Sequence, residues 1–146
     1  MFVIEAATEA TAEVVDALGR LLPLLSSSSG VPTTADVSEM VTSPATTLFI
    51  ARDGEDGPIV GTLTLALFRI PTGARAWIED VIVSDEVRGR GCGEQLTRVA
   101  LDAAAAAGAR TVDLTSRPTR ESANRLYQRL GFKLRVTNLY RYEFGA

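Results

Sequence analysis

Apolar residues recur at helical spacing in the first third of the chain. Between residues 10 and 25 they fall three and four positions apart, which predicts one amphipathic helix. The apolar members of this pattern are Val14, Val15, Leu18, Leu21, Leu22 and Leu25. Serines and a glycine at 26–30 end the helix and predict a loop. A second short helix is expected over 34–41, with Thr33 or Thr34 as its N-cap.

From residue 46 the pattern changes to the alternation that is typical of strands. Three strands are predicted at 47–51, 59–68 and 74–83, and a shorter one at 2–5. The connections between the three longer strands are short and contain Gly, Asp and Pro. Short connections favour antiparallel neighbours, so these strands should form a meander.

The clearest helix of the sequence spans residues 91–107. Its apolar residues share one face, its alanine run has the highest helix propensity, and Gly108 supplies the stop. A strand is expected next, at 111–115. A strand–helix–strand unit of this length predicts a right-handed crossover, with the strands around Val81 and Val112 roughly parallel.

A short helix and two strands are expected at the end of the chain. Pro118 cannot sit inside a helix, so the helix should run from about Arg120 to Leu130, where Gly131 ends it. The strands are predicted at 132–136 and 139–144. The whole order, β-α-α-β-β-β-α-β-α-β-β, predicts an α/β fold in a single domain over residues 1–146.

Composition narrows the class of protein. The 146 residues are 46% hydrophobic and 23% charged with a net charge of −3, which gives no basic face for nucleic acid. The N-terminus carries Glu5 and Glu9 without a basic region, which is unlike a signal peptide, and the longest uncharged stretch is too polar for a membrane span. Cys92 is the only cysteine, so no intrachain disulfide can form. We therefore expect a soluble, cytoplasmic protein without a membrane partner.

Histidine is absent from the sequence. Its absence removes Ser-His-Asp and Cys-His nucleophile schemes together with the commonest metal ligand. No metal site is predicted. Any general base must be a carboxylate, a tyrosine, an amine or a water molecule.

A glycine-rich turn joins the strand at 74–83 to the long helix. Residues 88–93 read Arg-Gly-Arg-Gly-Cys-Gly, and they open directly into the helix N-terminus. Glycine backbone lets a ligand approach closely, the helix N-terminus favours an anion, and two arginines add charge, so phosphate or pyrophosphate is the expected guest. A plain turn needs only one glycine, so three glycines favour anion binding over a simple turn. The dinucleotide-binding motif is disfavoured because it needs glycine where Glu94 stands. A P-loop is disfavoured because it needs a lysine followed by Ser or Thr, and neither is present there.

Two segments resemble a known family. Arg88, Gly91 and Gly93 fall on the defined positions of the Arg/Gln-x-x-Gly-x-Gly/Ala motif of the GNAT (general N-acetyltransferase) superfamily. Residues 122–132 are similar to its second motif, in which a helical tyrosine precedes Leu-Gly-Phe. The resemblance covers residues 46–144 strongly and the N-terminal third weakly. It implies a mixed, mostly antiparallel sheet with a splayed central strand pair, and acetyl-CoA as co-substrate.

The resemblance also implies which residues contact acetyl-CoA. Backbone groups of Val81, Ile82 and Val83 would meet the pantetheine arm, which takes the place of a missing strand between the splayed pair. The residues expected around the pyrophosphate are Arg88, Gly89, Arg90, Gly91, Cys92, Gly93 and Glu94. Many members carry an asparagine where this chain has Arg120. Either Arg120 takes a phosphate instead, or Asn124 contacts the cofactor one turn later.

Acyl transfer to an amine further requires an acid and a base. Tyr127 stands at the position of the family's general-acid tyrosine, although its other interpretation is a core aromatic. Glu79 is the favoured base, with Asp80, water or a merely solvated charge as alternatives. Strand alternation predicts that Glu79 and Asp80 face opposite sides. Cys92 is a poor nucleophile, yet its place at a helix N-terminus predicts a reactive thiol.

These features predict an N-acetyltransferase in which the bound amine attacks the thioester directly. The acceptor is open between a small-molecule amine and a peptide amine, and its selectivity should reside in the two N-terminal helices and the loop at 26–30. The alternative is a non-catalytic module that senses acetyl-CoA. A structural interaction domain would have no affinity for acetyl-CoA. The strand at 139–144 offers an edge for a homodimer.

Overall fold

The computed structural model describes residues 1–26 and 30–145. The chain divides into two compact units, Met1–Thr115 and Ser116–Ala146, and each is described by itself. The expectation of one domain over residues 1–146 stays a prediction.

The first unit is built on a sheet in the order β1-β2-β3-β4-β5. Its strands are β1 (Phe2–Ala7), β2 (Thr46–Asp53), β3 (Ile59–Ile70), β4 (Gly73–Val83) and β5 (Val112–Asp113). The first four pair antiparallel, and β4 pairs parallel with β5. The predicted meander and the parallel pair at Val112 are therefore confirmed, because short turns join the meander and a helix joins β4 to β5.

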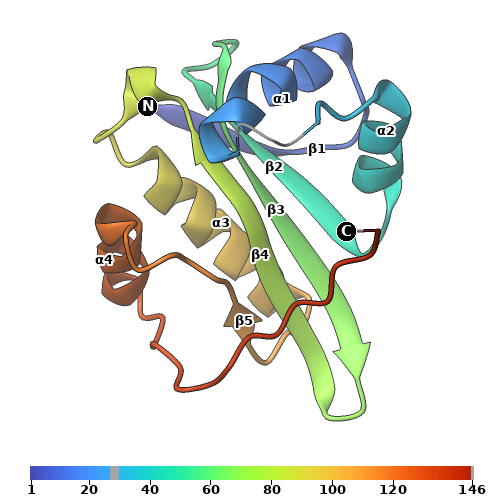
Figure 1. Cartoon of the computed structure of the whole chain (residues 1–146). Coiled ribbons are helices and arrows are strands. Elements are labelled where there is room, and N and C mark those ends of the chain that lie inside the picture. The colour runs from blue at the N-terminus through green and yellow to red at the C-terminus, as the bar shows by residue number, and fades with distance from the viewer. Residues whose placement is uncertain (27–29, 146) are drawn as a thin grey trace. The chain divides into compact units, whose positions relative to one another are not determined.

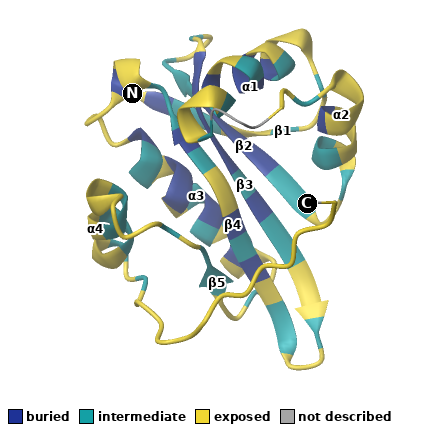
Figure 2. Ribbon diagram, viewed as in Figure 1, coloured by how far each residue is buried: buried dark blue, intermediate teal, exposed yellow. Residues whose placement is uncertain are grey.

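Helices cover both faces of this sheet. Figure 1 shows α1 (Ala12–Leu25) and α2 (Thr34–Thr42) on one face and α3 (Cys92–Ala106) on the other. Strand β2 therefore buries a continuous apolar run rather than alternating positions: Leu48 and Ile50 join the cluster under α1 and α2, and Phe49 and Ala51 are buried outside that cluster. Figure 2 shows buried segments along β2, β3 and β4.

Threonines begin both N-terminal helices. The Thr11 side chain accepts a hydrogen bond from the Val14 amide at the start of α1. Thr33 caps α2 in a reciprocal capping box with Asp36, which selects Thr33 over Thr34 as the N-cap. The described part of the loop predicted at 26–30 has no regular structure, and residues 27–29 lie outside the described residues.

The second unit contains α4 (Glu121–Arg129) and an extended tail. The two strands predicted at 132–136 and 139–144 are wrong, because no strand forms in the described residues 132–145. The apolar pattern there gives β propensity, but a strand exists only where its backbone pairs with a neighbour. The tail instead leaves large side chains exposed, namely Leu134, Val136, Leu139, Tyr140, Tyr142 and Phe144. No helix within the described residues is long and apolar enough to cross a bilayer.

Gly61 sets how closely α3 can approach β3. A Cβ at this position would lie 3.0 Å from Cys92 Sγ, 3.1 Å from Leu96 Cδ1 and 3.3 Å from the Ile82 carbonyl oxygen. All three neighbours belong to buried residues, so they have little room to move. We expect Gly61→Ala to lower the free energy of unfolding by about 1–3 kcal/mol in urea denaturation.

The matched control for this variant is Gly19→Ala. Gly19 lies inside α1, where an added Cβ would meet only Val31 Cγ1 at 3.7 Å. Alanine in a helix interior should raise stability there by about 0.5–1 kcal/mol. A Gly61→Ala protein as stable as the parent would contradict the close packing described for this face.

Candidate functional site

A β-bulge interrupts β4 in the middle of the sheet. Thr64 pairs with Glu79, and Thr62 pairs with Ile82, so β4 has one residue more than β3 between these pairs. Asp80 lies in the bulge with a φ of 50°, a conformation that L-residues other than Asn and Asp rarely adopt. The bulge is where the strand stops alternating.

Strand alternation predicts that Glu79 and Asp80 face opposite sides of the sheet. Because of the bulge, they do not. Glu79 lies opposite Thr64, and cross-strand partners share a face of the sheet. Thr64 and Asp80 line the same cavity. The Glu79 carboxylate accepts a hydrogen bond of 2.5 Å from Trp77 Nε1 and is not among the lining residues. The structure therefore gives Asp80, rather than the favoured Glu79, the position on the cavity.

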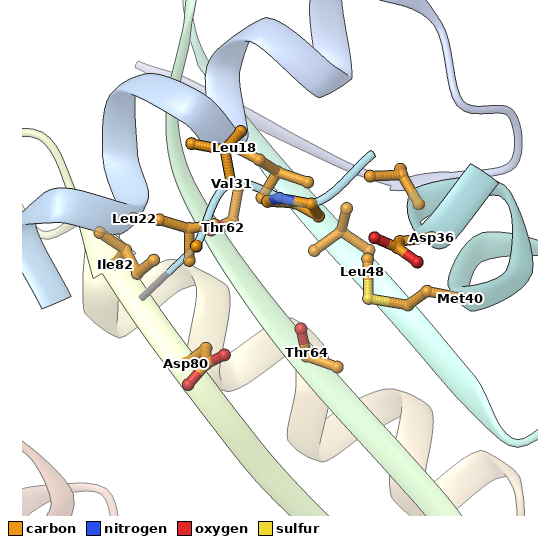
Figure 3. Close-up of a pocket in the computed structure, with 13 residues that line it drawn as sticks. Leu18, Leu22, Val31, Asp36, Met40, Leu48, Thr62, Thr64, Asp80 and Ile82 are labelled. Atoms are coloured by element: carbon orange, nitrogen blue, oxygen red, sulfur yellow. The ribbon is translucent and has the colours of Figure 1, made fainter. Parts of the chain in front are cut away.

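The cavity has a volume of about 510 Å³ and lies between the sheet and the two N-terminal helices. Its wall is formed by Leu18, Leu22, Gly30, Val31, Pro32, Asp36, Val37, Met40, Leu48, Thr62, Thr64, Asp80 and Ile82. Figure 3 shows Asp80 and Thr64 side by side on β4 and β3, with Asp36 and Met40 on α2 across the cavity. A cavity of this size and mostly apolar lining is typical of a small-molecule site.

Asp80 has the electrostatic character of a candidate base. Partial burial raises the pKa of its carboxyl, and the nearby negative charge of Glu79 raises it further. A carboxylate with a raised pKa is a stronger base than an ordinary surface Asp.

The glycine-rich turn follows β4 through a short 3-10 helix, Asp85–Val87. Gly89 and Gly91 have φ values of 78° and 84°, and an added Cβ at either position would meet nothing within 4 Å of the described structure. Gly91 is the N-cap of α3 and has no side chain to cap the first amides of the helix. Open glycine backbone at a helix N-terminus fits a phosphate group.

The two arginines of the turn differ in their partners. Arg90 makes a two-pronged ion pair with Asp53 at the end of β2, with distances of 3.0 and 3.1 Å, and its guanidinium lies 4.9 Å from the Phe2 ring centroid. Arg88 pairs with Asp85 and keeps 70% of its side chain exposed. Arg90 thus ties the turn to the sheet, and Arg88 is the arginine that remains open to a ligand. The predicted contacts of both with a pyrophosphate stay predictions.

Cys92 lies beneath the turn and not in it. Its side chain is buried against Gly61, so only its backbone can serve an anion. Burial raises the pKa of the thiol to about 11, and the charge of Asp53 adds to this effect. The prediction of a reactive thiol is wrong, because the pKa of the thiol is raised and not lowered. Desolvation raises the pKa by more than the field of the helix N-terminus lowers it.

Strand β4 is only briefly paired on its β5 side. The parallel pairs are Ala76 with Val112 and Trp77 with Asp113. From residue 78 to 83, no strand among the described residues pairs with this side of β4. This is the predicted splay, and it leaves the backbone of Val81–Val83 available for an extended ligand.

Comparison with known proteins agrees with this geometry. The model of the acetyltransferase (GNAT) family matches residues 20–132. The chain belongs to the GNAT family. The match includes every lining residue of the cavity except Leu18, together with the bulge, the glycine-rich turn and α4. A search of curated proteins finds no match to this chain.

Solved structures share the fold over nearly the whole chain. A protein from Agrobacterium tumefaciens str. C58 assigned as an acetyltransferase is 26% identical, with a TM-score of 0.83 over 97% of this chain and 99% of its own. A transcriptional regulator from Bacillus halodurans C-125 is 29% identical, with a TM-score of 0.79 over 98% and 100%. An aminoglycoside acetyltransferase from an uncultured soil metagenomic sample shares the fold at 18% identity, with a TM-score of 0.82 over 97% and 96%. Family and neighbours together support acetyl transfer in general.

The remaining predicted site residues of this GNAT chain lie on α4. Tyr127 is half-buried, with its ring centroid 5.7 Å from that of Phe132. Burial raises the pKa of its phenol, against a lowering by the charge of Arg120. Asn124 donates from its side-chain nitrogen to the carbonyl oxygens of Arg117 and Arg120 at 2.9 and 2.8 Å. This use of Asn124 holds the start of α4, and the cofactor roles of Arg120 and Asn124 stay predictions.

Sequence reasoning missed several residues of the cavity. Asp36 reads as an ordinary first-turn acid of α2, and Thr62 and Thr64 read as polar positions of a strand. Nothing in their local pattern distinguishes them from solvated residues. The sequence indicated only which elements would contribute, and not which residues. The two N-terminal helices, expected to hold the acceptor, do line the cavity.

Proposed function

We propose that this chain is an acetyl-CoA-dependent N-acetyltransferase that transfers acetyl directly from the thioester to a primary amine. The observation that carries the proposal is the course of β4. One strand brings Asp80 to an apolar cavity, continues with an unpaired backbone edge at Val81–Val83, and leads into the glycine-rich turn. A base, an extended docking edge and an anion site thus follow one another between Asp80 and Gly93.

The residues of this chain would divide the work as follows. The turn amides and Arg88 would hold the pyrophosphate, and β4 would hydrogen-bond the pantetheine arm. Asp80 takes a proton from the bound ammonium, and the free amine attacks the thioester carbonyl. The C–N bond forms and the C–S bond breaks; the departing thiolate receives a proton, and the nitrogen gives up its second proton to the group that supplied it. Tyr127 is the proposed donor of that proton, on the strength of its motif and of a raised pKa that keeps it protonated.

The test is release of CoA from acetyl-CoA across a panel of primary amines. Because Cys92 is buried with a raised pKa, a thiol reagent should report CoA with little background from the protein. We expect amine-dependent release for part of the panel. Binding of acetyl-CoA by calorimetry without release for any amine would instead support the sensor, and absence of binding would contradict both.

A variant at Gly91 tests the anion site when it is compared with a control variant. Gly91→Ala places a Cβ at a φ of 84° in the turn, and Gly108→Ala does the same at 82° beyond the other end of α3. Both alanines meet open space, so both should lose similar stability, about 1–2 kcal/mol. We expect calorimetry to show acetyl-CoA affinity at least about tenfold weaker in Gly91→Ala alone, since each 1.4 kcal/mol is a factor of ten. Equal affinity in the two variants would contradict a site at the turn.

A further inference from the structure

The cavity is acidic at two separate points. Asp80 projects from β4 on one wall, and Asp36 projects from α2 on the opposite wall (Figure 3). Among the described residues that line it, these two aspartates are the only charged ones. An acceptor that fills this cavity should therefore be cationic at two positions, and anionic acceptors should be disfavoured.

The charge of Asp36 is held in place by its own helix. Its Oδ2 accepts the Thr33 amide at 2.9 Å, and its amide donates to Thr33 Oγ1 at 3.1 Å. The backbone hydrogen bond of Thr33, followed by its side-chain hydrogen bond, lowers the pKa of Asp36 below the usual value. Asp36 is thus a fixed anion, whereas Asp80 is the carboxylate whose pKa is raised.

A threonine of the cavity wall offers a polar contact to a ligand. Thr62 keeps only 2% of its surface exposed and lines the cavity. No hydrogen bond of its hydroxyl is found within residues 1–26 and 30–145, where Ser116 Oγ is the only fully buried polar side-chain atom without a partner, so the Thr62 oxygen keeps some exposure. A hydroxyl without a protein partner on the cavity wall can hydrogen-bond a polar group of the occupant.

The rest of the wall is apolar. Leu18 and Leu22 from α1 and Met40 from α2 surround the space between the two acids. A hydrocarbon spacer would bury its surface against these side chains, and a sugar ring would leave its hydroxyls unpartnered there.

We propose that the acceptor is an aliphatic diamine, with one amino group at Asp80 and the second at Asp36. This proposal rests on the proposed function and adds the substrate class. Asp80 receives the amine that reacts, and Asp36 binds the amine that stays cationic. A single acetyl group is transferred to the amine at Asp80, and the other amine keeps its proton throughout.

The experiment compares amines that differ only in the second charge. Steady-state CoA release is measured for butylamine against 1,4-diaminobutane, and for the corresponding pairs one methylene shorter and longer. We expect kcat/KM to be about tenfold or more higher for the best diamine than for its monoamine, since a tenfold ratio corresponds to the low end of the contribution of a hydrogen bond to a charged group.

Asp36→Asn assigns that preference to one residue. The asparagine oxygen can still accept the Thr33 amide, so the cap of α2 is kept while the charge is lost. We expect the KM for the diamine to rise about tenfold, kcat to stay, and the monoamine to be unaffected. Glu39→Gln removes a charge from the same helix outside the cavity lining and should change neither substrate.

The two proposals can fail separately. Release with monoamines and diamines at equal kcat/KM, unchanged by Asp36→Asn, would overturn the diamine and leave the acetyltransferase standing. A loss that is equal for both kinds of amine in Asp36→Asn would also overturn it, because it would show a structural role. If none of the amines supports release of CoA, the proposed function itself is overturned.

Discussion

Asp80→Asn is expected to lower kcat/KM for the amine by about 10²–10⁴-fold, the usual contribution of a general base. Asp80 is the carboxylate with a raised pKa on the cavity wall. An amide of the same shape cannot accept the proton of the ammonium group. Steady-state CoA release at saturating acetyl-CoA measures the loss.

The same variant should be at least as stable as the parent. The folded-state pKa of Asp80 is raised above its unfolded value, so ionisation costs folding free energy, and this cost grows as pH rises through the interval between the two values. Above the folded-state pKa the cost is fully present, and asparagine removes it. Asparagine also tolerates the φ of 50° found at this position. Thermal unfolding at pH 7 should show an equal or higher Tm.

Glu79→Gln is the matched control for the base. Glutamine can keep the acceptor for Trp77 Nε1 while losing the charge that raises the pKa of Asp80. Activity should persist, and the acid limb of kcat/KM against pH should move to lower pH, since Asp80 then ionises more easily. If Glu79→Gln is inactive and Asp80→Asn active, the base is Glu79, as strand position alone favoured.

Tyr127→Phe is expected to lower kcat by about 10²-fold or more. The raised pKa of the phenol keeps it protonated through the neutral range, as a donor to the departing thiolate must be. Phenylalanine preserves the ring that packs edge-on against Phe132, at a centroid distance of 5.7 Å, so α4 should keep its structure. Steady-state kcat, with acetyl-CoA affinity by calorimetry, separates lost chemistry from lost binding.

Tyr140→Phe is the control for loss of a phenol. Tyr140 is 87% exposed in the tail of the second unit, and its variant should behave like the parent. Unchanged turnover in Tyr127→Phe would remove the acid assignment. The proton would then have to come from water or another group.

Features set by neighbours in sequence were predictable from the sequence alone. The helices begin where Thr11 and Thr33 can cap them, because a side-chain acceptor for the first amides is a local requirement. The glycine-rich turn indicated an anion site because positive φ at Gly89 and Gly91 and the start of α3 are also local properties. The apolar periods gave the meander and the long helix for the same reason.

Features set by partners distant in sequence needed the tertiary structure. The extra residue that turns Asp80 toward the cavity appears only in the pairing of β4 with β3, since a bulge has no period of its own. Burial under Gly61, 31 residues away in sequence, reversed the expected pKa shift of Cys92. Likewise, Arg90 forms an ion pair with Asp53, which is distant in sequence.

The same distinction explains the two predicted strands at the end of the chain, which are absent among the described residues. Their apolar pattern records a propensity, and a propensity becomes a strand only when another backbone supplies the hydrogen bonds. The sequence by itself thus determined the local elements of this GNAT chain and the place of its proposed anion site. Tertiary structure alone decided which carboxylates, Asp80 and Asp36, share one cavity, because that depends on packing α2 against strands that follow it in the sequence.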